Sequence, residues 1–288
     1  GRRLHAVAPR PKDASTLIDA LLQTKLPQVF AESTVAGDGS DWTREELHIL
    51  GGISIAVNAT VFDDGTHQEP NTHAETLEAG LVFVPGVLLR NDTGREPLDW
   101  DLIDDRTGTI LVDRYLDRYR QKLIPAFAWI QSHAMLAGKV AVVTVPGIGA
   151  GQFAGTFRGT LGGHFERALE AILAPLADRL TAVRLIYFDP YNECTDQERT
   201  YAQVNLRTRP YSRGGHRRAQ LCRPDQYSEE GDDFTHARLY SLVAWDPVSW
   251  PGNDFYAGVR ATDDGVKAAA TDVNSRLTGL AEEYDPAA

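Results

Sequence analysis

The feature that most constrains the fold is a strand, a glycine-rich loop, a helix and a second strand in direct succession. The run KVAVVTV at Lys139–Val145 is rich in β-branched residues, which is typical of a buried parallel strand. The loop at Pro146–Gly155 and a helical pattern follow it, and AVRLIYF at Ala182–Phe188 predicts the next strand. This succession is the βαβ unit, and it predicts an α/β domain built on a largely parallel sheet.

Patterns on both sides of this unit extend the same alternation. Helical spacing occurs at Ala14–Leu26, Asp113–Leu136 and Gly265–Leu280, and strand patterns occur at Ile53–Phe62, Gly80–Leu89 and Ala237–Trp245. Residues 189–233 have little periodicity, so we expect a long loop or insertion there. We therefore predict an N-terminal helical extension at 1–45 and one α/β domain at 46–282.

Composition excludes several classes of function. The net charge of −11 argues against a protein that wraps nucleic acid. No stretch approaches the roughly 18–20 apolar residues of a membrane span, so we expect no membrane partner. The two cysteines, Cys194 and Cys222, are too few for a disulfide scaffold and favour a reducing, cytoplasmic location, with secretion as an effector left open.

The glycine-rich loop is a candidate anion site. Glycines let the backbone approach a ligand closely, and the following helix adds a positive N-terminus. The candidate ligand-binding residues are Gly147, Gly149, Ala150, Gly151, Gln152, Phe153 and Ala154. Two other interpretations stay open, a tight crossover turn and a relaxed dinucleotide fingerprint of a nicotinamide-dependent enzyme.

Aspartates cluster after the last predicted strand. Asp246 ends that strand, Asp254 follows in a Pro-Gly turn, and Asp264 stands at a helix start, with Trp245 and Phe255 close by. Ligands of open α/β sheets bind beyond the carboxyl ends of the strands, so this is a site-like position. Singly, each aspartate also suits a turn or a helix cap, and together they would suit Mg²⁺, which we rank below a metal-free site.

The segment AWDPVSWPGNDFYAGVRATDDGVKAAAT resembles the signature of the arginine-specific macrodomain ADP-ribosylhydrolases, the MavL-like group. The resemblance implies a three-layer α/β/α fold with a mixed sheet and a catalytic role for Asp246, Asp254 and Asp264. GIGAGQFAG is similar to the macrodomain loop that holds the diphosphate, with Phe153 beside the distal ribose. By the same resemblance, Asn58 is a partial counterpart of the asparagine that macrodomains carry on their first strand.

The function that the resemblance implies is release of ADP-ribose from arginine side chains of modified proteins, without a cofactor. Its partners would be ADP-ribose and the mono-ADP-ribosylated protein. Carboxylates match the donor fork of a guanidinium and can activate water or stabilise an oxocarbenium-like state. The alternative is a non-catalytic ADP-ribose-binding or nucleotide-binding module. The basic run Arg207–Arg223 is expected to be a solvated loop.

Overall fold

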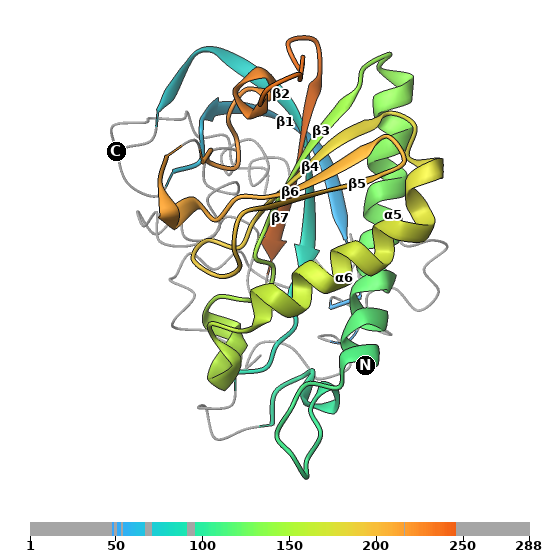
Figure 1. Ribbon diagram of the computed structural model, residues 1–288, viewed down its shortest axis with the longest axis vertical. Coiled ribbons are helices and arrows are strands. Elements are labelled where there is room, and N and C mark those ends of the chain that lie inside the picture. Colours follow the sequence, from blue (N-terminus) through green and yellow to red (C-terminus); the bar gives the residue numbers. More distant parts are fainter. Residues whose placement is uncertain are drawn as a thin grey trace, which may run out of the picture.

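One mixed sheet organises the part of the chain that the structure describes. The computed structural model describes residues 48, 51–52, 54–66, 71–90, 96–215 and 217–245. Seven strands in this part pair in the order β1-β2-β7-β3-β4-β6-β5 (Figure 1). The five inner strands are parallel, whereas β1 and β5 pair antiparallel at the two edges.

The strands are β1 (Ile55–Asp63), β2 (Thr72–Pro85), β3 (Ala141–Pro146), β4 (Val183–Asp189), β5 (Gln197–Tyr201), β6 (Val204–Thr208) and β7 (Arg238–Trp245). The α-helices are α5 (Val112–Leu136) and α6 (Leu161–Leu176). Short 3₁₀ turns are η1 (Trp100–Leu102), η2 (Gln152–Phe157), η3 (Ala177–Arg179), η4 (Tyr211–Arg213) and η5 (Pro224–Tyr227).

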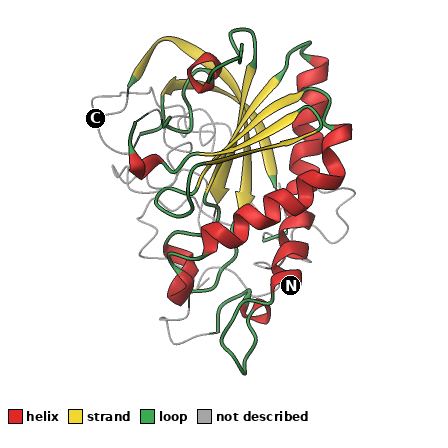
Figure 2. Cartoon of the chain, in the orientation of Figure 1, coloured by secondary structure: helices red, strands yellow, loops and turns green. Residues whose placement is uncertain are grey.

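Both described α-helices pack on one face of the sheet (Figure 2). Successive strand residues point to opposite faces, so Val143 contacts the helices and Val142 contacts the other side. The apolar stripes of α5 and α6 supply Tyr119, Phe127 and Phe165 to this buried layer. None of the helices in the described ranges is long and apolar enough to cross a membrane.

The opposite face has a second core. Between residues 217 and 237 the chain runs across this face and buries Leu221, Tyr227 and Phe234 against β7 and its neighbours. The α/β architecture with a mixed sheet is confirmed. Of the two helical layers that we expected, the described residues supply the one formed by α5 and α6.

The elements differ from the sequence predictions in two places. Strand β2 spans Thr72–Pro85 rather than Gly80–Leu89. It begins earlier because its first half is an exposed, polar hairpin arm that carries no apolar run. The segment 189–233, expected to be a loop, contributes β5 and β6 to the sheet edge. Strand β5 (QERTY) is polar and partly exposed along its length, so periodicity does not reveal it. The domain limits at residues 46 and 282 lie outside the described residues and stay predictions.

Candidate functional site

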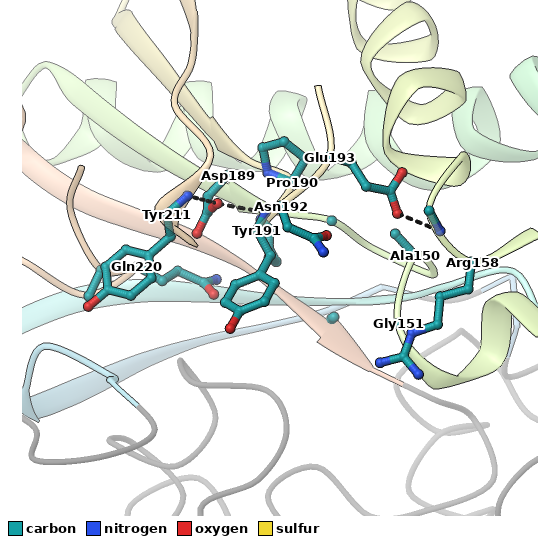
Figure 3. A pocket seen from close by; sticks show the side chains of 15 residues that line it. Ala150, Gly151, Arg158, Asp189, Pro190, Tyr191, Asn192, Glu193, Tyr211 and Gln220 are labelled. Atoms are coloured by element: carbon teal, nitrogen blue, oxygen red, sulfur yellow. Dashed lines mark hydrogen bonds between the residues drawn. The ribbon is translucent and has the colours of Figure 1, made fainter. Parts of the chain in front are cut away.

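A pocket of about 360 Å³ opens at the carboxyl edge of the parallel strands. Loops that follow β3, β4 and β6 form its walls, as Figure 3 shows. Ligands of open α/β sheets bind at this edge. The lining residues are Pro146, Gly147, Ala150, Gly151, Arg158, Gly159, Asp189, Pro190, Tyr191, Asn192, Glu193, Tyr211, Ala219, Gln220 and Ala244.

The glycine loop is held in place from behind. Gly149 has φ +80°, and a Cβ there would lie 2.8 Å from the Tyr119 hydroxyl oxygen. The backbone of Gly149 also touches Gly86, where an added Cβ would lie 2.8 Å from the Gly149 nitrogen. Burial raises the pKa of Tyr119, so its hydroxyl keeps its proton and donates to the Ile148 carbonyl oxygen at 2.8 Å. Glycine at position 149 therefore allows Tyr119 and Gly86 to pack closely against the loop, and its positive φ determines the shape of the loop.

The predicted loop residues divide into three groups. Gly147, Ala150 and Gly151 line the pocket. Phe153 and Ala154 are buried, and the Phe153 carbonyl accepts a hydrogen bond from the Leu89 amide at 2.8 Å. Gln152 is exposed, and neither it nor Gly149 is among the pocket residues. The loop thus presents backbone rather than side chains to the pocket.

Two residues of this loop that line the pocket have backbone amides without an acceptor in the described part of the chain. Among the described residues, the amides of Gly147 and Gly151 donate to no acceptor. Arg158, three positions after the loop ends at Gly155, is exposed, and its guanidinium has no carboxylate partner in the same set. Free amides and an unpaired guanidinium are the groups that bind phosphate oxygens.

The opposite wall comes from the turn after β4. Asp189 accepts hydrogen bonds from the amides of Tyr191 at 2.7 Å and Tyr211 at 2.8 Å, which ties this turn to the end of β6. Tyr191 and Cys194 have φ values of 60° and 59°, which non-glycine residues rarely adopt. The Tyr191 side chain is 57% exposed, so its ring is available to a ligand.

Glu193 lies against the N-terminus of α6. Its carboxylate accepts hydrogen bonds from the amides of Gly159 at 3.1 Å and Gly162 at 2.6 Å. The Gly162 amide is among those that the first turn of a helix leaves unpaired, and Gly159 lies just before the N-cap residue Thr160. The carboxylate therefore caps the N-terminus of α6, which carries a partial positive charge, at the wall of the pocket (Figure 3).

A polar cluster beneath the pocket fixes Gln220. The hydroxyl oxygens of Thr144 and Ser241 lie 2.9 Å apart, and the Gln220 side-chain amide donates to Ser241 at 2.7 Å. Thr144 and Ser241 are buried. Because buried polar groups need partners, this cluster fixes the orientation of the Gln220 side chain at the pocket floor.

The remaining predicted residues are distributed as follows. Asn58 lies on edge strand β1, opposite Gly80, and its side-chain oxygen accepts a hydrogen bond from Arg238 at 2.9 Å. It is not among the pocket residues. Trp245 ends β7 next to Pro85, and its side chain packs in the second core. Asp246, Asp254, Asp264 and Phe255 lie outside the described residues.

The cysteines are poor nucleophiles. Burial is the main reason that the pKa values of Cys194 and Cys222 rise to about 12, with Glu166 adding to the effect at Cys194 and Asp64 at Cys222. A thiol with such a pKa holds little thiolate at neutral pH. Within the described ranges, no cluster of three or more histidine, cysteine, aspartate or glutamate side chains is arranged to hold a metal ion.

The basic run is largely engaged in internal ion pairs. Arg207 is 3% exposed and pairs with Glu198 at 3.1 Å and Asp232 at 2.8 Å. Arg217 pairs with Asp196 at 2.5 Å. These arginines connect the sheet edge to the covering segment, so the run is more structural than the solvated loop that we expected.

Sequence reasoning missed Arg158, Asp189, Tyr191, Glu193 and Tyr211 as pocket residues. Asp189 carried a usable signal, because it directly follows an apolar strand. The others depend on how three loops fold over one edge, which no local pattern reveals.

Two comparisons with known proteins bear on this site. No curated protein matches the chain significantly. The model of the family described as macrodomain effector MavL matches residues 5–288, which includes the sheet, the glycine loop and the pocket. Membership of this family supports an ADP-ribose-related function. Because the match spans nearly the whole sequence, the chain belongs to the MavL macrodomain effector family.

Proposed function

We propose that this protein hydrolyses the N-glycosidic bond between ADP-ribose and modified arginine side chains of other proteins. The observation that carries the proposal is the pocket at the carboxyl edge of the sheet, which is lined by Arg158 and by glycine-loop residues whose amides have no acceptor among the described residues. In a macrodomain, such a pocket suits a ligand that joins a diphosphate to an adenosine and a second ribose.

The ligand would lie along the pocket with its diphosphate on the glycine loop. The amides of Gly147 and Gly151 would donate to phosphate oxygens, and the Arg158 guanidinium would neutralise part of their charge. Figure 3 shows the rings of Tyr191 and Tyr211 away from Arg158, across the pocket. Those rings would stack on the adenine.

The proposed catalytic residues are Asp246, Asp254 and Asp264. Asp246 directly follows Trp245, and Ala244 of the same strand lines the pocket, so the chain leaves β7 at the site. One carboxylate would hold the arginine guanidinium and another would activate water. A third would stabilise positive charge that develops on the distal ribose.

Release of ADP-ribose from an arginine-modified protein tests the proposal. The wild-type protein is expected to release free ADP-ribose, whereas Asp254→Ala and Asp264→Ala are expected to lose about 100-fold or more in rate. Circular dichroism and ADP-ribose affinity show whether each variant still folds and binds. Full activity in either variant would remove that residue from the catalytic set, and no release by the wild type would reject the hydrolase.

One observation favours a non-catalytic ADP-ribose-binding module as the second candidate. The described carboxylates that line the pocket, Asp189 and Glu193, are both held by backbone amides and serve to position loops. Neither is arranged as a base toward the pocket. ADP-ribose binding by the wild type without any release from modified arginine would support this candidate.

A further inference from the structure

The pocket has two places that attract anions, and one of them is already filled. The glycine loop offers amides that have no acceptor among the described residues. The N-terminus of α6 offers the amides of Gly159 and Gly162, but the Glu193 carboxylate binds both. A phosphate group can therefore occupy the first place without rearrangement, and at the second it meets a negative charge.

The Glu193 side chain is held where it lies. A Cβ added to Gly162 would come within 2.8 Å of the Glu193 Oε2 atom and 2.9 Å of its Cβ, so no space separates the side chain from the helix. The surrounding turn is fixed by the Glu193 amide donating to Pro190 at 3.2 Å and by Arg213 donating to the Cys194 carbonyl at 2.7 Å. The carboxylate thus forms part of the pocket wall, held by two backbone amides.

We propose that Glu193 determines specificity by admitting nucleotides with a diphosphate and rejecting those with a longer phosphate chain. This inference rests on the proposed ADP-ribose function of the same pocket. Arg158 and the glycine-loop amides would stabilise the charge of a diphosphate, whereas a third phosphate would extend toward the carboxylate at the α6 N-terminus. Like charges in a partly enclosed pocket repel strongly, because the effective dielectric constant there is far below that of water.

Calorimetric titration of Glu193→Gln with ADP-ribose, ATP and adenosine, in a buffer without divalent cations, tests the proposal. Glutamine keeps the size of the side chain and removes its charge. We expect ATP affinity to rise about tenfold, ADP-ribose affinity to change less than about threefold, and adenosine affinity to stay constant. Glu193→Asp retains the negative charge and is expected to reject ATP as the wild type does.

The matched control is Glu230→Gln, which removes one carboxylate from a different pocket and should leave all three affinities unchanged. An unchanged preference for ADP-ribose over ATP in Glu193→Gln would overturn the proposal. A parallel loss of ADP-ribose and adenosine binding would overturn it as well, because Glu193 would then serve only to hold the wall.

Pyrophosphate and tripolyphosphate separate this inference from the proposed function. If the wild type binds no ADP-ribose, the proposed function fails, yet the two polyphosphates still report on Glu193. The inference predicts that Glu193→Gln gains about tenfold for tripolyphosphate and much less for pyrophosphate. Equal gains, or no gain for either anion, would reject the inference by itself.

Discussion

At the scale of single residues, Arg158 is the cation best placed to bind a diphosphate. It lines the pocket beside the glycine loop and makes no ion pair among the described residues. Arg158→Gln is expected to weaken ADP-ribose binding about tenfold, which is the effect of losing one charge-assisted contact. Adenosine binding should stay unchanged, because it lacks phosphate.

Calorimetry on Arg158→Gln measures this effect, and Arg106→Gln is the matched control, since it removes the same charge from an exposed loop away from the pocket. Equal affinities for ADP-ribose in wild type and Arg158→Gln would contradict a role for this arginine.

Lys122 is a buried basic residue whose effect on the unfolding free energy depends on pH. It is 2% exposed and donates to the Pro85 carbonyl at 2.9 Å, while burial lowers its pKa from 10.5 to about 7. Between these values the unfolded chain holds a proton that the folded chain lacks, so stability rises with pH across this window. Below pH 7 Lys122 is protonated in both the folded and the unfolded state, so the destabilisation by its buried charge is at its maximum.

Lys122→Met removes this titration. Relative to wild type, the variant is expected to gain about 1.4 kcal/mol in unfolding free energy for each pH unit from 10 down to 7. Urea denaturation at several pH values measures the difference, and Lys139→Met, an exposed lysine, should show no such trend. A pH-independent difference for Lys122→Met would contradict the lowered pKa.

At the scale of elements, the loop between β3 and α6 depends on Gly149 for its conformation and on Gly151 for the access of a ligand to the backbone. Gly149→Ala combines a left-handed φ of 80° with a contact at 2.8 Å to Tyr119. We expect it to cost about 2–4 kcal/mol of unfolding free energy. Gly151 has φ −81° and no neighbour within 4 Å of an added Cβ, so Gly151→Ala should fold normally.

Thermal unfolding distinguishes the two alanine variants, and ligand titration adds a second measurement. Because Gly151 lines the pocket, its new methyl group is expected to weaken ADP-ribose binding although the fold is intact. Similar stabilities of Gly149→Ala and wild type would show that the loop can adopt another conformation.

The elements that the sequence predicted best are those whose own residues determine them. Strand β3 is a buried run rich in β-branched residues, and α5 carries an apolar stripe that α6 and the sheet bury. Strand β5 and the first half of β2 are exposed and polar, so only their pairing partners make them strands. The same logic applies to the site, because Gly147 and Gly151 belong to one conspicuous loop, whereas Tyr191 and Tyr211 reach the pocket through tertiary contacts.

At the scale of the whole molecule, the pocket joins segments that are far apart in sequence. Its walls come from loops after β3, β4 and β6, and its floor includes Ala244 of β7. These strands are neighbours in the order β7-β3-β4-β6, so a ligand at their carboxyl edge contacts the whole centre of the sheet at once. Binding there should therefore oppose global unfolding rather than stabilise a single loop.

Ligand binding to the folded state alone raises the unfolding free energy by RT ln(1 + [L]/Kd), which is about 2.7 kcal/mol at a ligand concentration of 100 Kd. We expect ADP-ribose to raise the melting temperature accordingly. At the same ligand concentration, Arg158→Gln should lose about 1.4 kcal/mol of this gain if its Kd is tenfold higher. Differential scanning calorimetry measures both effects. A melting temperature that ADP-ribose leaves unchanged at saturating concentration would be incompatible with binding at the centre of the sheet, whatever the role of the aspartates after Trp245.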